Sequence, residues 1–172
     1  MGYTTEFEGK FQIEPPLNPK LANYINRFSN VRHMRRNVEK TKELYPNWRD
    51  LCFRCRLGYE GEYFAIESDD YGQGHTSDII DYNESPKTQP GLWCDWIVPE
   101  DDPSALRWNG SVKFYDYKEW LEYLIKNFLE PNGHVVNGTV EFKGENPDDK
   151  GYLYVNDNKV EMVYDDESLT FD

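Results

Sequence analysis

The sequence contains no run of about 18 apolar residues, the length that a membrane-spanning helix requires. Its first residues, from Met1 to Glu6, lack a basic segment followed by an apolar one, so we expect no secretory signal. The 3 cysteines are few and odd in number, which argues against a disulfide framework. We therefore expect a cytoplasmic protein.

The composition predicts a globular fold. A chain of 172 residues is long enough to bury a core without disulfides or metal. Aromatic residues make up 16% of the chain, and each buried ring removes a large apolar area from water. We expect a single α+β domain over residues 1–164, with an irregular insertion at about 37–91 and an acidic tail at 165–172.

The charge is strongly negative and unevenly distributed. The chain carries a formal charge of −13, from 32 acidic and 19 basic residues. Residues 27–56 hold 9 basic and 3 acidic groups, a charge of +6, which leaves −19 for the remainder. Such a chain repels nucleic acid and anionic lipid and is attracted to basic protein surfaces. The alternative interpretation is that the charge serves solubility alone.

The first half of the chain predicts a strand and a helix. Residues 3–13 alternate between apolar and polar side chains, the pattern of a half-buried strand. Asn18 and Pro19 then form a typical helix start, with Asn18 as the N-cap and Pro19 at the first helical position. We expect this helix to run to about Arg36.

The second half predicts a hairpin, a helix and a meander. Residues 92–98 and 105–108 are expected to form the hairpin. Asp116 opens a capping-box pattern, and the apolar spacing after it predicts an amphipathic helix that Pro131 and Gly133 end. Further strands are expected at 139–143, 151–155 and 159–164.

This order of elements favours helices packed on an antiparallel sheet. Without the irregular insertion, it reads βαββαβ followed by a hairpin. We therefore predict an α+β fold, a ferredoxin-like βαββαβ sheet with two helices on one face plus a C-terminal β-hairpin.

Three arginines form the first candidate site. Arg32, Arg35 and Arg36 lie within one helical turn of one another, and guanidinium groups bind phosphate or carboxylate in a bidentate manner. The pattern predicts an anion-binding pocket for a nucleotide or another phosphorylated ligand. The alternative is that these arginines pair with the protein's own carboxylates.

A zinc site is a second possibility. Cys52 and Cys55 have the spacing of half a zinc site, and His75 and Cys94 could complete it. A second tight cysteine pair is missing, however, and Cys94 occupies an apolar strand position where a buried thiol is ordinary. Apart from this zinc, we expect no cofactor.

The acidic hairpin is a candidate protein-binding surface. Trp93 and Trp96 are expected on opposite faces of the strand, so that one of them could be exposed. An exposed tryptophan beside acids suits a protein-binding hot spot. The residues expected to contribute are Trp93, Asp95, Glu100, Asp101 and Asp102. The alternative is a sheet that is covered on both faces.

Catalytic motifs are sparse. The sequence lacks the nucleophile-elbow, zinc-protease and Walker patterns, and its three histidines have no evident nucleophile beside them. We therefore interpret the chain as a non-enzyme. A small hydrolase that uses the loop at 68–91 stays open as an alternative.

Several segments carry a resemblance to known proteins. They are Asp81-Tyr82-Asn83, residues 89–96, Phe114-Tyr115-Asp116-Tyr117, residues 119–124, residues 137–142 and Gly144-Glu145. With these segments the chain resembles a family of small, acidic, uncharacterised proteins of bacteriophages and bacteria. The most specific resemblance lies between about residues 80 and 160, and the stretch around Cys52 and Cys55 departs from it. The resemblance implies a phage or mobile-element setting, hence the cytoplasm of the host cell, without an assigned activity.

Charge and resemblance together predict a non-enzymatic, phage-type inhibitor or adaptor. Its expected partner is a host protein with a basic surface, and we expect no direct contact with nucleic acid or membrane. By imitating the charge of DNA it would block a nucleic-acid-binding surface, as anti-CRISPR inhibitors do. The alternative is a sponge for a nucleotide signal that uses the arginine cluster.

Overall fold

The structure, a computed structural model, describes residues 2–165 and divides into two compact units. The first unit comprises the described parts of Met1–Ala22 and Asp95–Asp172, and the second comprises Asn23–Cys94. The segments of the first unit hold 21 acidic and 9 basic residues, a formal charge of −12. Those of the second hold 11 acidic and 10 basic residues, a charge of −1. The negative charge of the chain is therefore concentrated in the first unit.

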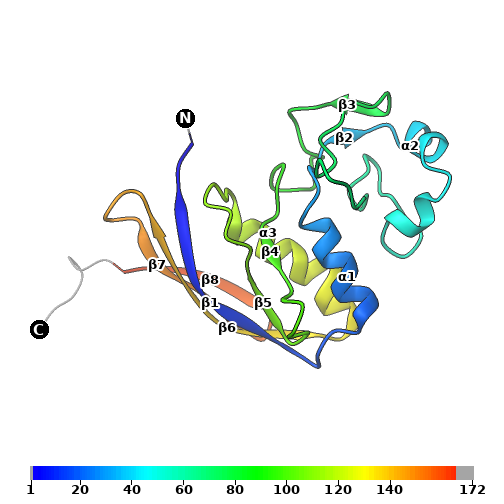
Figure 1. The fold of residues 1–172 in the computed structure, drawn as a ribbon. Coiled ribbons are helices and arrows are strands. Elements are labelled where there is room, and N and C mark those ends of the chain that lie inside the picture. The colour runs from blue at the N-terminus through cyan, green and yellow to red at the C-terminus, as the bar shows by residue number, and fades with distance from the viewer. Residues whose placement is uncertain (1, 166–172) are drawn as a thin grey trace, which may run out of the picture. The chain divides into compact units, whose positions relative to one another are not determined.

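The first unit is built on a six-stranded antiparallel sheet in the order β4-β5-β1-β6-β7-β8 (Figure 1). The predicted alternation in the first strand is confirmed, because Phe7 and Phe11 are buried whereas Glu6 and Glu8 are exposed. The strands are β1 (Thr5–Glu14), β4 (Trp96–Ile97), β5 (Ala105–Trp108), β6 (Val135–Gly144), β7 (Lys150–Asn156) and β8 (Lys159–Tyr164).

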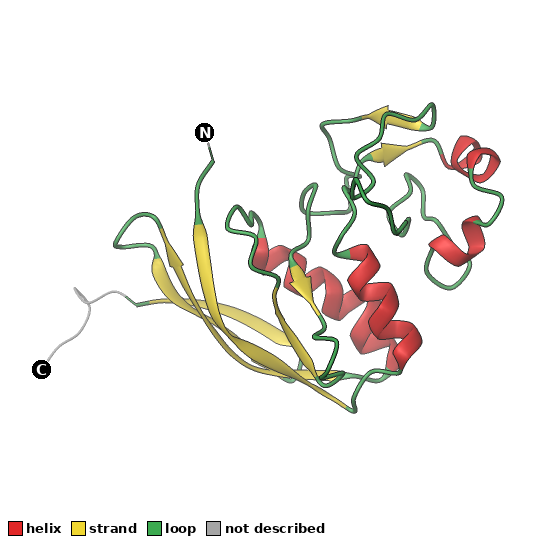
Figure 2. Ribbon diagram, viewed as in Figure 1, coloured by secondary structure: helices red, strands yellow, loops and turns green. Residues whose placement is uncertain are grey.

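One helix covers a face of this sheet (Figure 2). It is α3 (Tyr117–Leu124), which continues through a π-helical turn (Ile125–Leu129) and a 3₁₀ turn (Glu130–Asn132). Gly133 ends it with a φ of 81°, as its sequence position predicted. The capping-box prediction at Asp116 is wrong, because that residue has a φ of 55° and its side chain makes no capping hydrogen bond.

Aromatic rings fill the space between α3 and the sheet. The ring centroid of Phe7 lies 5.4 Å from that of Trp96 and 4.9 Å from that of Tyr117. The Tyr117 ring is in turn 5.8 Å from Phe142 on β6. Burial of each such side chain contributes about 1.5–3 kcal/mol to folding. The core of the first unit is therefore aromatic, as the composition indicated.

The first helix, α1 (Pro19–Phe28), begins in the first unit and continues into the second. The Oδ1 atom of Asn18 accepts a hydrogen bond of 2.8 Å from the Leu21 N–H, which confirms the predicted N-cap. The expectation that this helix runs to about residue 36 is wrong. It ends at Phe28, because the chain beyond it becomes extended and forms a short strand.

The second unit contains short elements around a small core. They are β2 (Arg35–Arg36), α2 (Val38–Leu44), a 3₁₀ turn (Trp48–Leu51) and β3 (Ile79–Asp81), which pairs with β2. Cys52, Leu57 and Phe64 form the buried core, against which Val38, Tyr45, Trp48, Leu51 and Ile66 pack.

The fold prediction is confirmed in its coarse form, a mixed fold with three α-helices and an antiparallel sheet in the described residues. The strand order differs from that of a four-stranded ferredoxin-like sheet, because β7 pairs along β6 and extends the same sheet with β8. The predicted strand at 92–98 is reduced to Trp96–Ile97, since the chain passes between the units at Asp95.

The single-domain assignment with an insertion at about 37–91 stays a prediction. Of the predicted acidic tail, residues 166–172 lie outside the described part of the chain. From residue 2 to residue 165, none of the helices has the length and apolar character needed to cross a bilayer.

Candidate protein-binding surface

Two of the three arginines predicted to bind an anion pair with acids of the second unit. Arg35 Nε lies 2.7 Å from Glu60 Oε2, and its Nη1 lies 3.5 Å from Glu84 Oε1. Arg36 Nη1 lies 2.7 Å from Asp78 Oδ2, and this pair is closed to solvent. For these two arginines the structure thus shows internal pairing, the alternative that the sequence left open.

Arg32 has other partners. Its Nε and Nη2 atoms donate hydrogen bonds of 3.2 and 3.1 Å to the Tyr82 carbonyl, and its guanidinium lies 4.3 Å from the centre of the Tyr82 ring. The His75 ring stacks on the same tyrosine at 4.0 Å. The three guanidinium groups therefore have separate partners within the protein, and their binding of an anion stays a prediction.

The predicted zinc ligands are not gathered either. Cys52 and Cys94 are buried and Cys55 is exposed, and all three are free thiols. Burial raises the pKa of the Cys52 thiol above its usual range, which favours the protonated form. In residues 2–165 no three His, Cys, Asp or Glu side chains form a group suited to a metal ion.

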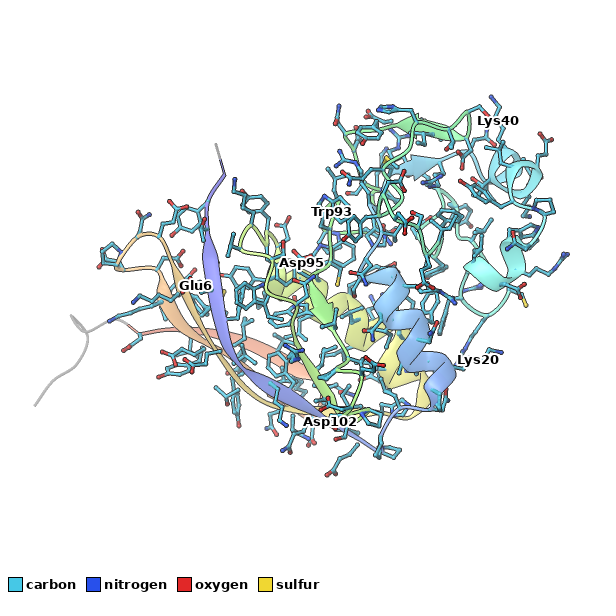
Figure 3. The ribbon with its side chains drawn as sticks, viewed as in Figure 1. Glu6, Lys20, Lys40, Trp93, Asp95 and Asp102 are labelled. Atoms are coloured by element: carbon cyan, nitrogen blue, oxygen red, sulfur yellow. The ribbon has the colours of Figure 1, made fainter. Side chains whose placement is uncertain are left out.

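The predicted acidic hairpin surface falls into separate parts. Asp95 and Asp102 lie at opposite ends of the β4–β5 hairpin (Figure 3). Asp95 is only 5% exposed, and burial raises its pKa to about 6 although Asn109 Nδ2 donates to it at 3.1 Å. Trp93 is half-buried in the second unit. Asp95 therefore offers little surface to a partner.

The turn of the same hairpin is more open. Glu100 and Asp101 are exposed. Asp102 accepts hydrogen bonds from the hydroxyl and the N–H of Ser104, and these lower its pKa. Lys10 Nζ lies 3.4 Å from the same carboxylate. This turn presents charge without an exposed aromatic ring in its own residues, 99–103.

A different group of residues joins rings to carboxylates, at the end of the sheet where a turn connects β6 to β7. The Tyr3 hydroxyl donates to Asp149 Oδ2 at 2.7 Å and accepts from the Asn146 N–H at 3.1 Å. The Tyr3 N–H donates to the Tyr115 hydroxyl at 2.9 Å. We call this group the tyrosine–acid cluster and define it as Tyr3, Tyr115, Tyr117, Tyr164, Glu119, Glu145 and Asp149.

Hydrogen bonds hold two acids of this cluster in place. Glu145 Oε1 accepts from the Thr4 N–H at 2.6 Å, which ties the β6–β7 turn to the start of β1. The Tyr3 hydroxyl holds the Asp149 carboxylate, and the Asp149 carbonyl accepts from the Gly144 N–H at 2.7 Å, which closes the turn. The carboxylates of Glu145 and Asp149 are therefore arranged before any partner arrives, which lowers the entropy cost of binding.

Two phenols of the cluster, Tyr3 and Tyr117, have a pKa above the usual range, which favours their protonated form. Burial raises the pKa of Tyr117 far above its usual range, and Asp149, Tyr164, Tyr3 and Glu119 add to the effect in that order. Tyr115 and Tyr164 are 50% and 54% exposed, so their rings are open to a partner. Tyrosine rings beside carboxylates suit the recognition of arginine and lysine side chains.

The sequence prediction missed this cluster because its members come from four distant segments. A local signal was present in Tyr115-Asp116-Tyr117 and Tyr164-Asp165, where tyrosines adjoin acids. Adjacency alone does not indicate which tyrosines share a surface. The packing of β1, α3, β7 and β8 brings them together.

Comparisons with protein-family models, with curated proteins and with solved structures give no match to this chain.

Proposed function

We propose that this protein is a non-enzymatic binding protein whose tyrosine–acid cluster docks on a basic segment of a partner protein. The observation that carries the proposal is that one end of the sheet combines exposed tyrosine rings with the carboxylates of Glu145 and Asp149, each held by a hydrogen bond. Tyrosine is enriched at the centres of protein interfaces, because its ring supplies contact area at low entropy cost.

The charge of the first unit supports the same partner. A formal charge of −12 attracts lysine- and arginine-rich surfaces and accelerates encounter with them. Surfaces of this kind normally bind nucleic acid. The proposed partner is therefore a nucleic-acid-binding protein, and the binding would block its substrate.

We further propose that residues 80–160 are related to small phage and bacterial proteins, and that the protein is a phage-type inhibitor of a host protein. Internal pairing of Arg35 and Arg36 leaves less support for the nucleotide sponge. A hydrolase has less support as well, because His33 is buried and His75 is stacked on a tyrosine.

An arginine-rich peptide labelled for fluorescence anisotropy tests the proposal. We expect binding that weakens as salt rises from about 50 mM to about 500 mM, because screening acts on exposed charges. Glu119→Gln combined with Glu145→Gln should weaken binding about three- to tenfold.

The matched control is Glu100→Gln combined with Asp101→Asn, which removes the same charge from the exposed β4–β5 turn. It should leave the affinity close to that of the unaltered protein. Equal losses in the two variants would show that total charge, and not this cluster, drives binding. Absence of any binding at low salt would remove the proposal.

We also propose that β1, α1, β4, β5, α3 and β6 form a ferredoxin-like βαββαβ unit that β7 and β8 extend. Support comes from β1 lying between β5 and β6, with antiparallel pairing throughout. A crystal structure tests this proposal: α1 on the sheet face opposite to α3 would contradict it.

A further inference from the structure

A pocket of about 400 Å³ lies within the second unit. None of its lining residues belongs to the tyrosine–acid cluster, whose members are all in the first unit. One wall is the second half of α1 with the turn after it, and the other is the loop from Ile66 to Tyr71. The volume lies in the range of small-molecule sites.

The helical wall is rich in amides. Asn23, Asn26 and Asn30 line the pocket at spacings of three and four residues, so they follow one side of the helix and its final turn. Arg27 lies between them and donates to Asn23 Oδ1 and to the Asp50 carbonyl, each at 3.3 Å. Its buried Nε–H has no acceptor among the described residues, so its hydrogen-bonding capacity is not exhausted.

Hydrogen bonds among Ser68, Asp70 and Gly72 hold the loop wall. Ser68 Oγ donates to Asp70 Oδ1 at 2.7 Å, and the Gly72 N–H donates to Ser68 Oγ at 2.9 Å. Glu67 and Asp69 line the pocket with exposed carboxylates, and neither has a hydrogen-bond or ion-pair partner in residues 2–165. These two acids are thus available to a ligand.

An aromatic residue, Tyr71, also lines the pocket. Tyr71 is 53% exposed and has a φ of 58°, in the left-handed region that residues with a side chain seldom adopt. The Arg32 N–H donates to the Tyr71 carbonyl at 2.9 Å and holds this backbone in place. Ile66 adds an apolar patch, and it is anchored against the core of the second unit.

We propose that this pocket binds a neutral sugar, a monosaccharide or a disaccharide. Arg27, Glu67 and Asp69 give the lining a net charge of −1, which disfavours phosphates and carboxylates. Amides donate and accept while carboxylates accept, and sugar hydroxyl groups require both kinds of partner. The Tyr71 ring and Ile66 suit the apolar C–H face of a pyranose ring.

Titrations followed by nuclear magnetic resonance test the proposal on the full chain. The probes are glucose, galactose, maltose and lactose, with adenosine, cytidine and inorganic phosphate as competing classes. We expect a sugar to bind with a Kd of about 0.1–10 mM and to shift the side-chain NH₂ signals of Asn23, Asn26 and Asn30.

Two variants locate the site. Tyr71→Ala and Asp69→Asn should each weaken sugar binding about fivefold or more. Tyr59→Ala is the matched control, because Tyr59 belongs to the same unit, is 95% exposed and does not line the pocket. It should leave the Kd unchanged.

Three outcomes would overturn the proposal. The first is the absence of any signal shift with the four sugars at about 50 mM. The second is a shift of these asparagine signals with a nucleoside or phosphate but with no sugar. The third is an equal loss of sugar affinity in Tyr71→Ala and Tyr59→Ala. Because the peptide assay uses residues of the first unit, failure here leaves the protein-binding proposal standing, and the reverse also holds.

Discussion

Arg36 and Asp78 form an ion pair that is closed to solvent, with 2.7 Å between Nη1 and Oδ2 and side chains that are 3% and 0% exposed. The Thr41 hydroxyl donates to the same carboxylate oxygen at 2.7 Å. Arg36 belongs to β2, Thr41 to α2, and Asp78 precedes β3. This network therefore joins three elements of a unit that has a small apolar core.

We expect Arg36→Met to destabilise the protein by about 3–5 kcal/mol, because it leaves the Asp78 carboxylate buried without its counter-charge. The loss should shrink on acidification, since protonation then neutralises Asp78. Urea unfolding at pH 7 and pH 4.5 measures both effects. Arg35→Met is the control, and its partly exposed ion pairs predict a smaller loss. Equal losses would contradict the role of burial.

Asp95 predicts an unusual pH dependence. Burial raises its pKa to about 6 in the folded protein, above the unfolded value of 3.8, so the folded state binds the proton more tightly. Stability is therefore lost as pH rises from about 4 to about 6, by up to about 3 kcal/mol. Asp95→Asn should remove this loss and stabilise the protein at pH 7.

The control for Asp95 is Asp102→Asn. The Ser104 hydroxyl and N–H lower the pKa of Asp102, so its contribution is present above pH 3.8 and is lost at lower pH. We expect this variant to be less stable than the unaltered protein at pH 7, opposite to Asp95→Asn. Thermal unfolding of both variants at pH 4 and pH 7 tests this prediction. Changes of the same sign in Tm at pH 7 would contradict it.

His33 acts in the opposite direction to Asp95. Burial lowers its pKa to about 3, while its Nε2–H donates to the Phe28 carbonyl at 2.8 Å. Below about pH 6.5 the His33 side chain binds a proton in the unfolded chain but not in the folded protein. The free energy of unfolding therefore falls by up to about 1.4 kcal/mol for each unit by which the pH is lowered. His33→Gln should abolish this loss between about pH 6 and pH 4. An unchanged slope of unfolding free energy against pH would refute it.

Two residues that the sequence marks as helix caps should respond differently to substitution. Asn18→Ala should cost about 1 kcal/mol, because it removes the acceptor for the Leu21 N–H. Asp116→Gly should leave stability unchanged or raise it, since glycine adopts a φ of 55° without strain and no side-chain cap is lost. Chemical denaturation of both variants measures the contrast, and a larger loss for Asp116→Gly would contradict it.

The sequence by itself determined the elements whose cause is local. The buried face of β1 follows from the alternation of Phe7 and Phe11 with acids, and α1 begins where Asn18 precedes Pro19. The C-terminal strands likewise follow from alternation and from a tight turn at residues 156–158. Each of these patterns acts over a few residues, where propensity and capping dominate.

Only the tertiary structure decided where α1 ends, how far the hairpin extends and which side chains share a surface. Arg35 and Arg36 leave the helical path because they pair with Ile79–Asp81, more than 40 residues away. Tyr3 meets Tyr115 and Asp149 for the same reason, across separations of 112 and 146 residues. Strand pairing and burial over such separations override local preference, because they remove whole faces from water and satisfy their polar groups at once.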